Sequence, residues 1–434
     1  MITLEQIRSW GRLSAHEHAV VDPVFVDQAQ AALSEKGPIL GFGAGRSYGD
    51  VCLNGSGRLL RTRSLDRLIG ADWSTGIIRA EAGLTLDTLL RLAVPKGWFV
   101  PVLPGTKFVT LGGAVANDIH GKNHETAGTF GCHVRRLGLA RSTGEVLELG
   151  PEQNTELFAA TIGGLGLTGI ILWVELALVR TTSALIDVET LELPNLDAFF
   201  RLSEQSQPWE FTVAWVDCLA KGAAVGRGLF IRGRWHVGGA LVPHKPSRLR
   251  VPFDAPSWPL TGTTVRLFNR AYRSRPWALG QRTVHYDQFF FPLDTLAGWN
   301  KLYGPNGFFQ HQCVLPTTSA PDALRRLLDL TSAYGQGSFL IVLKMFGDRP
   351  SPGILSFPRR GATLALDFPN RGESTRRLLD EMASVVIEAG GRLYPAKDAT
   401  MTAEAFRTGY PDWQKVEKLR DPNIMSDFWR RVAA

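Results

Sequence analysis

Residues Pro101–Phe130 read PVLPGTKFVTLGGAVANDIHGKNHETAGTF, a glycine-rich stretch around which the rest of the chain is organised. Two more glycine-rich segments flank it, Gly41–Asp50 (GFGAGRSYGD) upstream and Gly163–Gly169 (GGLGLTG) downstream. Glycine admits positive φ and lets the backbone approach a ligand closely. Successive amides in such loops form concave sites for anions, above all phosphates. Three of these segments in one half of the chain predict one large phosphate-bearing cofactor, although tight turns alone would also account for the glycines.

The chain has 434 residues, enough for two domains with a substantial core. Its net charge is +7, but no run of lysine or arginine is dense enough to indicate nucleic-acid binding. The excess of positive charge would favour binding of a phosphorylated substrate or an anionic membrane surface, or it could simply form a solvated basic surface. Four scattered cysteines favour a reducing, cytoplasmic location. The sequence predicts neither a secretory signal nor a bilayer-spanning segment.

The first half of the chain mixes strand and helix patterns, which predicts an α+β fold. Apolar residues at i, i+3, i+4 and i+7 from Leu86 predict a helix that stops before Pro95. A long apolar run over residues 167–178 predicts a buried strand. Further strands are predicted at 38–42, 59–62, 77–82, 134–140 and 146–149, and further helices at 26–36 and 156–161.

The pattern changes after Thr182. Alternation over residues 210–217 predicts a half-buried strand, and we interpret the aromatic runs at 288–292 and 308–316 as strands. Residues 243–274 are rich in proline, arginine and tryptophan, and we interpret them as a long loop. The remaining predictions are strands at 338–346 and 363–368, and helices at 320–333, 373–388 and over most of 402–434.

Neither of two common nucleotide motifs is present. The first glycine loop is not a GxGxxG followed by a helix, and the chain has no GxxxxGK[ST], so the cofactor is bound by another fold. His120 and His124 have the i, i+4 spacing of a zinc site, but Gly121 stands where the zincin motif has glutamate. With no third ligand indicated, we expect no metal.

Several motifs together resemble a known family. They are GAGRSYGD (43–50), PVLPGT (101–106), DIHGKNH (118–124), GGLGLTGI (163–170), QFFFPLD (288–294) and GRLYPAKD (391–398). With them the chain resembles the vanillyl-alcohol-oxidase/p-cresol-methylhydroxylase (VAO/PCMH) flavoprotein superfamily, and within it the decaprenylphosphoryl-β-D-ribose 2′-oxidase family. The resemblance implies a two-domain α+β flavoprotein. Its FAD-binding domain would span 1–182, its cap domain with an antiparallel sheet 183–391, and a C-terminal segment, 392–434, would complete the FAD-binding domain.

The resemblance also implies how the cofactor is held. The implied FAD-binding residues are Gly43, Ala44, Gly45, Arg46, Ser47, Tyr48, Gly49, Pro104, Gly105, Thr106, Gly112, Gly113, Asn117, Ile119, His120, Gly121, Ile170 and Tyr394. The residues up to Gly113 would wrap the diphosphate, and most of the others would line the flavin. In many superfamily members a histidine of the first loop bonds covalently to FAD. Arg46 stands at that position, so we expect non-covalent FAD.

Alcohol oxidation by a flavin needs a partner for the hydroxyl proton and a group that stabilises the reduced flavin. By resemblance Lys397 is the first candidate, either to anchor the substrate or to tune the flavin. Tyr48 could relay a proton or serve packing alone. His120 could act as a base or make a purely structural hydrogen bond.

The implied substrate-binding residues are Lys122, Trp215, Phe290, Gln312, Lys344, Ala365 and Lys397. Lys122 is a candidate for the substrate phosphate or for the cofactor. Trp215 and Phe290 could equally be core residues. Mycobacterial members carry cysteine at the position of Ala365 and tyrosine at that of Phe290, so we expect a pocket of different shape.

The implied activity is oxidation of the 2′-hydroxyl of a polyprenylphosphoryl-β-D-ribose to a ketone, the first half of a 2′-epimerisation that gives an arabinose donor for arabinan in the cell wall. A separate NAD(P)H-dependent keto-reductase would complete it. Residues 243–274 would suit peripheral contact with the inner face of the membrane. Two alternatives stay open: an FAD-dependent aldonolactone or alditol oxidase acting on a soluble sugar, and a non-enzymatic module that binds flavin or lipid phosphate.

Overall fold

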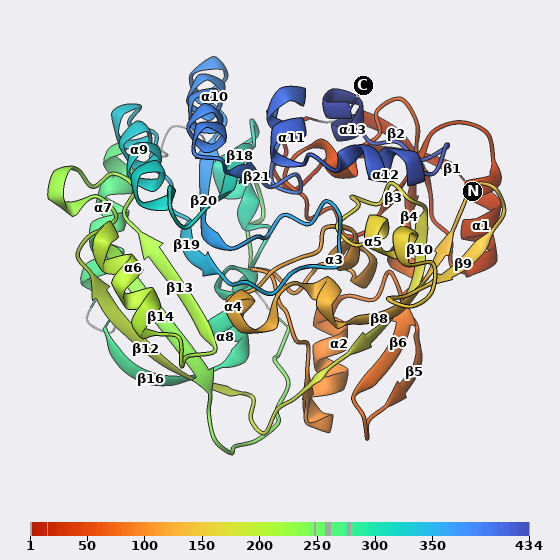
Figure 1. Ribbon diagram of the computed structural model, residues 1–434, viewed down its shortest axis with the longest axis horizontal. Helices are drawn as coiled ribbons and strands as arrows, with labels where there is room; N and C mark the ends of the chain where they lie inside the picture. The colour runs from red at the N-terminus through yellow and green to blue at the C-terminus, as the bar shows by residue number, and fades with distance from the viewer. Residues whose placement is uncertain (1, 15, 247–248, 257–261, 276–278, 434) are drawn as a thin grey trace.

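A computed structural model describes residues 2–14, 16–246, 249–256, 262–275 and 279–433 (Figure 1). The first sheet has the order β1 (Ile2–Ile7), β2 (His16–Val21), β4 (Arg58–Arg61), β3 (Ile39–Phe42). Helix α1 (Val26–Ser34) connects β2 to β3, and both strands run parallel to β4. The helix ends two residues before its predicted end, ahead of Gly37, whose φ is +101°.

The second sheet is antiparallel, with the order β5 (Leu68–Asp72), β6 (Ile77–Glu81), β10 (Ile170–Ala177), β8 (Val134–Ala140), β9 (Val146–Leu149). The helix predicted from Leu86 is confirmed as α2 (Leu86–Ala93). The Thr85 hydroxyl caps it by accepting a hydrogen bond from Thr88 N at 3.3 Å, which satisfies one amide of the first turn. Helices α3 (Leu111–Ala116), α4 (His124–Ala127) and α5 (Thr155–Thr161) and the short pair β7 (Trp98–Phe99) and β11 (Val179–Arg180) complete this half.

The cap is one antiparallel sheet in the described residues. Its order is β16 (Gly280–His285), β12 (Leu185–Leu193), β14 (Gly228–Trp235), β13 (Phe211–Val216), β19 (Ile341–Phe346), β20 (Gly361–Pro369), β18 (Phe308–Leu315), β21 (Arg392–Leu393). Helices α6 (Leu196–Gln205), α9 (Ala320–Ala333) and α10 (Glu373–Glu388) pack on it and bury their apolar faces (Figure 1). The antiparallel cap and the α+β class are as predicted.

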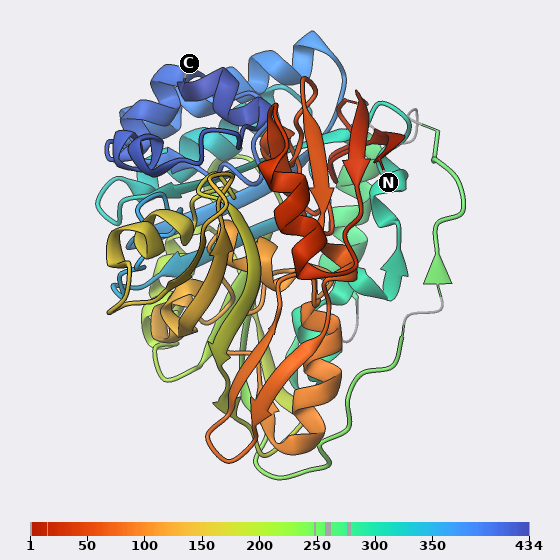
Figure 2. The ribbon, with the colours of Figure 1, turned by 90° about the vertical axis from the view of Figure 1, so that its right-hand side faces the viewer.

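The C-terminal helices lie beside the first sheet, at the opposite end of the sequence (Figure 2). They are α11 (Ala403–Gly409), α12 (Trp413–Leu419) and α13 (Asp427–Ala433). Ile424 forms a bridge with Ile39 of β3, and Arg431 pairs with Asp50 at 2.7 Å. The chain therefore leaves the cap sheet at β21 and returns to its own beginning. The domain boundaries expected at 182 and 391 stay a prediction.

Two predictions in the cap are wrong. The aromatic run at 288–292 begins inside a short helix, α8 (Tyr286–Phe290), because all its phenylalanines are buried and an unbroken apolar run shows no period. The loop expected over 243–274 contains α7 (Gly262–Ser274), while 247–248 and 257–261 lie outside the described residues. Helix α7 buries only Val265 and Asn269, too narrow a face to show a clear period in the sequence. A short parallel pair, β15 (Leu249–Arg250) and β17 (Leu296–Ala297), lies in the same region.

Candidate active site

All three glycine-rich segments line one cavity of about 350 Å³. Residues of the ranges 41–52, 103–122 and 165–171 contribute to its wall, and cap strands β13, β18, β19 and β20 and the segment 394–397 complete it. Of the site residues predicted from the sequence, all but Gly49 and Trp215 lie in this lining. Segments from both ends of the chain thus converge on one site.

The cap strands present every second side chain to the cavity. Gln310 and Gln312 of β18 pair in register with Asp367 and Ala365 of β20, and all four residues line the cavity. Residues between them, such as Leu366, lie in the core that includes helices α9 and α10. This alternation follows from the strand geometry, in which successive side chains point to opposite faces.

The first loop follows β3 directly and has free backbone amides. Gly45 has φ of +61°, and a Cβ on Gly43 would lie 2.5 Å from Thr110 Oγ1, so both positions require glycine. In the described part of the chain, the amides of Ala44 to Ser47 donate to no protein acceptor, whereas Tyr48 N donates to Ala396 O at 2.9 Å. A run of free amides at a cavity wall fits a diphosphate.

The backbone amides of Gly112 and Gly113, which we expected to face the diphosphate, donate hydrogen bonds within the protein. Gly112 N donates to Ala82 O at 2.8 Å, and Gly113 N donates to the Thr110 hydroxyl at 3.1 Å. A Cβ on Gly112 would lie 3.0 Å from Ala82 Cβ. Both amides are therefore used within the protein, and Gly112 is needed because the start of α3 packs closely against residue 82.

Four buried polar atoms of lining residues have no protein partner among the residues described: Arg46 Nε, Asn117 Oδ1, His120 Nδ1 and Asp367 Oδ2. An unsatisfied buried polar atom costs about 1–3 kcal/mol. FAD offers ring nitrogens, carbonyl oxygens, hydroxyls and a diphosphate, which can supply the missing partners. The residues present therefore fit this cofactor. Arg46 is also stacked, with its guanidinium 4.1 Å from the centroid of the Trp10 ring.

His120 is a neutral donor rather than a free base. Burial lowers the pKa of its imidazole well below the usual range, and nearby Lys344 lowers it further. Its Nε2 lies 3.0 Å from the Gln312 amide nitrogen, which can only donate. Nε2 therefore accepts, and the proton resides on Nδ1. The lone pair that a general base needs is already occupied.

The carboxylate of Asp118 in the DIHGKNH motif is structural. It accepts hydrogen bonds from Gly131 N at 2.8 Å, from Ser351 Oγ at 2.5 Å and from Ser356 Oγ. His124 is also structural, with Nδ1 accepting from Gly347 N at 3.2 Å. Only residues 119–122 of this motif line the cavity.

Three lysines face the cavity: Lys344 is buried, and Lys122 and Lys397 are half-buried. Burial lowers the pKa of Lys122 to about 7 and that of Lys344 to about 8. Lys122 donates to Phe289 O, and Lys344 donates to Gly121 O at 3.2 Å. Among the described residues, none of the three has a carboxylate oxygen within 4.0 Å. An anionic ligand would satisfy all three.

Asp367 is a site residue that the sequence reading missed. It is fully buried, its Oδ1 accepts from the Gln310 amide, and its Oδ2 has no partner in the described residues. Burial raises the pKa of Asp367 and lowers that of Lys397, while each charge favours the other's ionised form. The same carboxylate raises the pKa of Tyr48, after burial. Asp367, Tyr48 and Lys397 thus form one electrostatic unit.

Trp10 and Trp299 were missed as well, and both line the cavity. No local pattern marks either as a site residue, because their segments reach the site only through tertiary packing. Trp215, by contrast, lies outside the lining. Its ring packs 4.7 Å from Tyr272, and its Nε1 donates to Phe339 O at 3.2 Å. Val213, on the same strand face, lines the cavity instead.

Gly49 is required for packing. A Cβ there would lie 1.6 Å from Asp398 O, so only glycine allows the first loop to meet the segment 394–398. On that segment Tyr394 stacks on Phe357 at 4.5 Å and donates its hydroxyl to Asn117 O at 3.0 Å. The segment 394–398 therefore contacts both the first loop and the end of α3.

The chain is similar in sequence to a family of FAD-binding domains and to several known proteins. The FAD binding domain family model matches residues 19–150. Decaprenylphosphoryl-beta-D-ribose oxidase of Mycolicibacterium smegmatis is 35% identical over 99% of this chain and 98% of its own length. An uncharacterized protein of the mprA 5′ region of Streptomyces coelicolor is 33% identical over 80% of this chain and 100% of its own length. L-Gulonolactone oxidase of Mus musculus is 29% identical over 37% of each chain.

The cofactor is FAD, since the family model covers the first two glycine-rich segments and the cavity residues fit it. The whole-length match extends the relationship through the cap and the C-terminal helices. The chain therefore belongs to the decaprenylphosphoryl-β-D-ribose oxidase family, FAD-dependent oxidoreductases of the VAO/PCMH type.

Proposed function

We propose that the protein oxidises the 2′-hydroxyl of a polyprenylphosphoryl-β-D-ribose to a ketone. The observation that carries this proposal is the set of three buried or half-buried lysines that line the same cavity as the FAD loops and have no carboxylate partner within 4.0 Å among the described residues. A phosphodiester next to the sugar would match that charge. The name of the mycobacterial relative supports the choice of sugar.

Bound FAD supplies a two-electron acceptor for the hydrogen on the carbinol carbon. The protein residues handle the proton and the charge. Lys397, whose pKa is lowered by burial, is partly neutral near pH 7, so its amine can take the hydroxyl proton. The Asp367 carboxylate raises the pKa of Lys397 and would thereby set how readily the amine takes that proton.

The remaining cavity residues orient the substrate. Lys122 and Lys344 would bind the phosphate, while the Nδ1–H of His120 offers a hydrogen bond to the flavin or the sugar. Phe290 and Ala365 line the cavity without polar side-chain atoms. The hydroxyl and thiol that the resemblance placed at these positions in mycobacterial members are replaced here by an aromatic edge and a methyl group.

The direct test is anaerobic reduction of the bound flavin with a panel of polyprenylphosphoryl pentoses. Bleaching of the visible flavin absorbance by the ribose derivative, and not by the arabinose epimer or by free ribose, is the expected result. Bleaching by soluble polyols or lactones would select the aldonolactone or alditol oxidase instead. The structural support for that alternative is weaker, since the lactone-oxidase relatives match less than half of the chain. No bleaching with any sugar would favour a binding module.

A ketone product needs a second enzyme to complete an epimerisation. We propose an NAD(P)H-dependent keto-reductase as the consumer of the product, because a hydride must return to C2′ from the opposite face. Release of arabinose-configured product only when such a reductase is added would support it. Accumulation of the arabinose epimer without any reductase would overturn it.

Contact with an anionic membrane is proposed for helix α7. In the part of the chain that the structure describes, no helix combines the length and the apolar character that a bilayer crossing requires. Helix α7 carries Arg266, Arg270 and Arg273 and no acidic residue, with Leu267 and Phe268 exposed. Basic and apolar side chains together suit the surface of an anionic bilayer. The protein would then lie at the inner face of the membrane.

Vesicle flotation at low salt tests this contact. The protein should float with anionic vesicles and remain below with neutral ones. Replacing Leu267 and Phe268 with serine should weaken flotation, whereas serine at exposed Val146, on β9 of the other half, should not. Equal flotation of all three proteins would exclude α7 as the contact.

A further inference from the structure

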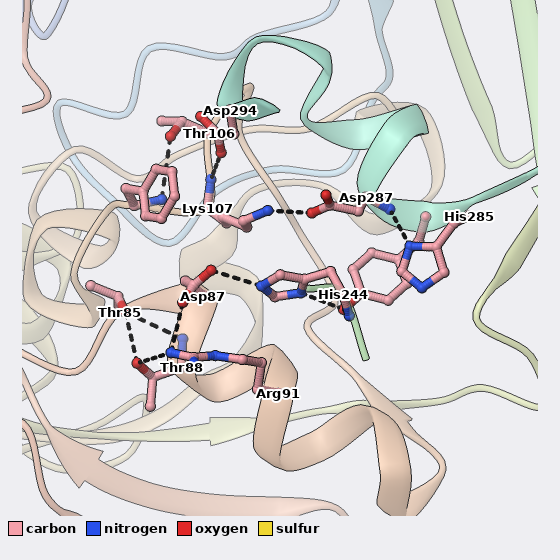
Figure 3. A network of polar contacts seen from close by, with 12 residues as sticks. Thr85, Asp87, Thr88, Arg91, Thr106, Lys107, His244, His285, Asp287 and Asp294 are labelled. Atoms are coloured by element: carbon pink, nitrogen blue, oxygen red, sulfur yellow. Dashed lines mark hydrogen bonds and ion pairs between the residues drawn. The ribbon is translucent and has the colours of Figure 1, made fainter. Parts of the chain in front are cut away.

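The turn Thr106–Lys107 at the edge of the cavity is held by two carboxylates from the cap half of the chain (Figure 3). Lys107 N donates to Asp294 Oδ2 at 2.8 Å, and Lys107 Nζ is ion-paired with Asp287. Within the turn, the Thr106 hydroxyl accepts a hydrogen bond from Phe108 N at 3.3 Å. Asp287 belongs to α8, and Asp294 lies in the 3₁₀ turn Pro292–Thr295 that follows it.

These contacts are buried. Lys107 is only 1% exposed and Asp294 only 4% exposed. Lys107 does not belong to the cavity lining. A lysine so placed has no solvent to replace its partner, so the ion pair with Asp287 constrains where the turn can lie. The backbone bond to Asp294 adds a second, directional constraint.

A neighbouring pair of contacts extends the network to helix α2 (Figure 3). His244 Nε2 lies 2.7 Å from Asp87 Oδ1, and His244 Nδ1 lies 2.7 Å from the Tyr286 hydroxyl. Asp87 N donates to Lys107 O at 2.9 Å. The turn is therefore fixed from two sides. Helix α2 binds the Lys107 carbonyl, and α8 binds the Lys107 side chain.

The turn lies at the cavity that would hold FAD. Gly105 and Thr106 line the cavity together with Arg46 and Ser47 of the first loop, where the free amides lie. A Cβ on Gly105 would meet no atom within 4 Å, so the space beside it is open to a ligand.

We propose that Asp287 and Asp294 are positioning residues for FAD: carboxylates of the cap that hold the Thr106–Lys107 turn against the cofactor. FAD binding and the contacts of Asp287 and Asp294 with the turn then stabilise each other. If these contacts raise the affinity for FAD by some factor, bound FAD strengthens the contacts by the same factor. The proposal requires FAD binding but no particular substrate, so it stands apart from the sugar named above.

The test is the rate at which flavin leaves the purified holoprotein after dilution, followed by ultrafiltration and the flavin absorbance of the filtrate. Asp287→Asn and Asp294→Asn should each release FAD about tenfold faster than the wild type, the effect of losing one charge-assisted hydrogen bond. Asp287→Glu, which keeps the charge, should release FAD at a rate closer to the wild type.

Asp217→Asn is the matched control. Asp217 is another buried cap carboxylate, paired with Arg227 at 2.9 Å and with Asn269 at 2.8 Å, and it does not touch the turn. It should keep FAD as the wild type does. Wild-type release from both network variants would overturn the proposal, and so would equally fast release from Asp217→Asn.

A variant that fails to fold would not stop the test. Lys107→Met combined with Asp287→Leu removes both charges and leaves no unpaired ion, a change that folded proteins tolerate. This double variant should fold and still release FAD faster than the wild type. Release at the wild-type rate from the folded double variant would exclude a role for the Lys107–Asp287 pair.

Discussion

Lys397 Nζ lies 3.8 Å from the centroid of the Tyr48 ring, although the two residues come from opposite ends of the chain. The contact is a cation–π arrangement between a buried tyrosine ring and a half-buried lysine. It is held by the bond from Tyr48 N to Ala396 O. The C-terminal segment therefore delivers a reactive amine to a loop that binds the cofactor.

Lys397→Ala should abolish turnover while FAD stays bound. Loss of a group that takes the hydroxyl proton costs about 10²–10⁴ in rate. Stopped-flow flavin reduction measures the rate, and the ratio of flavin to protein absorbance measures retention. Lys415→Ala, at an exposed lysine paired only with Asp412, should leave both unchanged. Normal turnover in Lys397→Ala would remove this residue from the site.

Asp367→Asn should shift the pH profile of flavin reduction. The Asp367 carboxylate raises the pKa of Lys397, so its removal lets that pKa fall further. The amine is then neutral at lower pH, and the rising limb of the rate moves to lower pH. A limb that stays in place, or moves to higher pH, would contradict an effect of the Asp367 charge on Lys397.

Lys344→Met should raise KM for the phosphorylated substrate about tenfold with a smaller change in kcat, because a charge-assisted contact is lost. The pKa of Lys344 is lowered to about 8 by burial, so the wild-type lysine loses its charge as pH rises through that value. The wild-type KM should therefore increase with pH above about 8, and the Lys344→Met profile should lack that step. Identical profiles would place the phosphate elsewhere.

Acid precipitation should release the flavin into the supernatant. Arg46 stands at the position where a histidine would form the covalent bond, and its guanidinium is stacked on Trp10 at 4.1 Å. A guanidinium stays protonated and is no nucleophile. Yellow colour that remains in the washed pellet would refute non-covalent binding.

Gly49→Ala should destabilise the fold without a direct effect on the cofactor. A Cβ would lie 1.6 Å from Asp398 O, a clash with backbone that cannot move aside cheaply. Overpacking of this kind costs about 1–3 kcal/mol or more. Thermal unfolding measures the loss. Gly70→Ala, where a Cβ would meet nothing within 4 Å, should unfold like the wild type.

Much of the fold follows from local sequence. Helix α2, strands β8 and β9 and helix α10 have clear periods or caps, and the structure confirms them. The errors fall where the local signal is weak. Helix α8 has only five residues, too few for a helical period to stand out from the aromatic run that follows, and α7 buries only two residues.

The site divides in the same way. Lys397 and the glycine loops are recognisable because their motifs are unusual in sequence. Asp367 and Gln310 alternate with apolar residues on cap strands, and no local feature tells which face meets the cofactor. Trp215 shows most clearly that local sequence does not predict which residues of a strand line the cavity. It shares a strand face with Val213, but a shift of about 7 Å along the strand takes it out of the lining.

From the sequence alone, the density of glycines predicts a large phosphate-bearing cofactor, because such segments allow close backbone approach. The family resemblance added Lys122, Lys344 and Lys397 as candidates. Only the tertiary structure decided which glycines offer free amides and which, like Gly49, admit a neighbouring segment. It alone brought Asp367 to Lys397, because the shift of a pKa depends on burial and on charges that are distant in sequence.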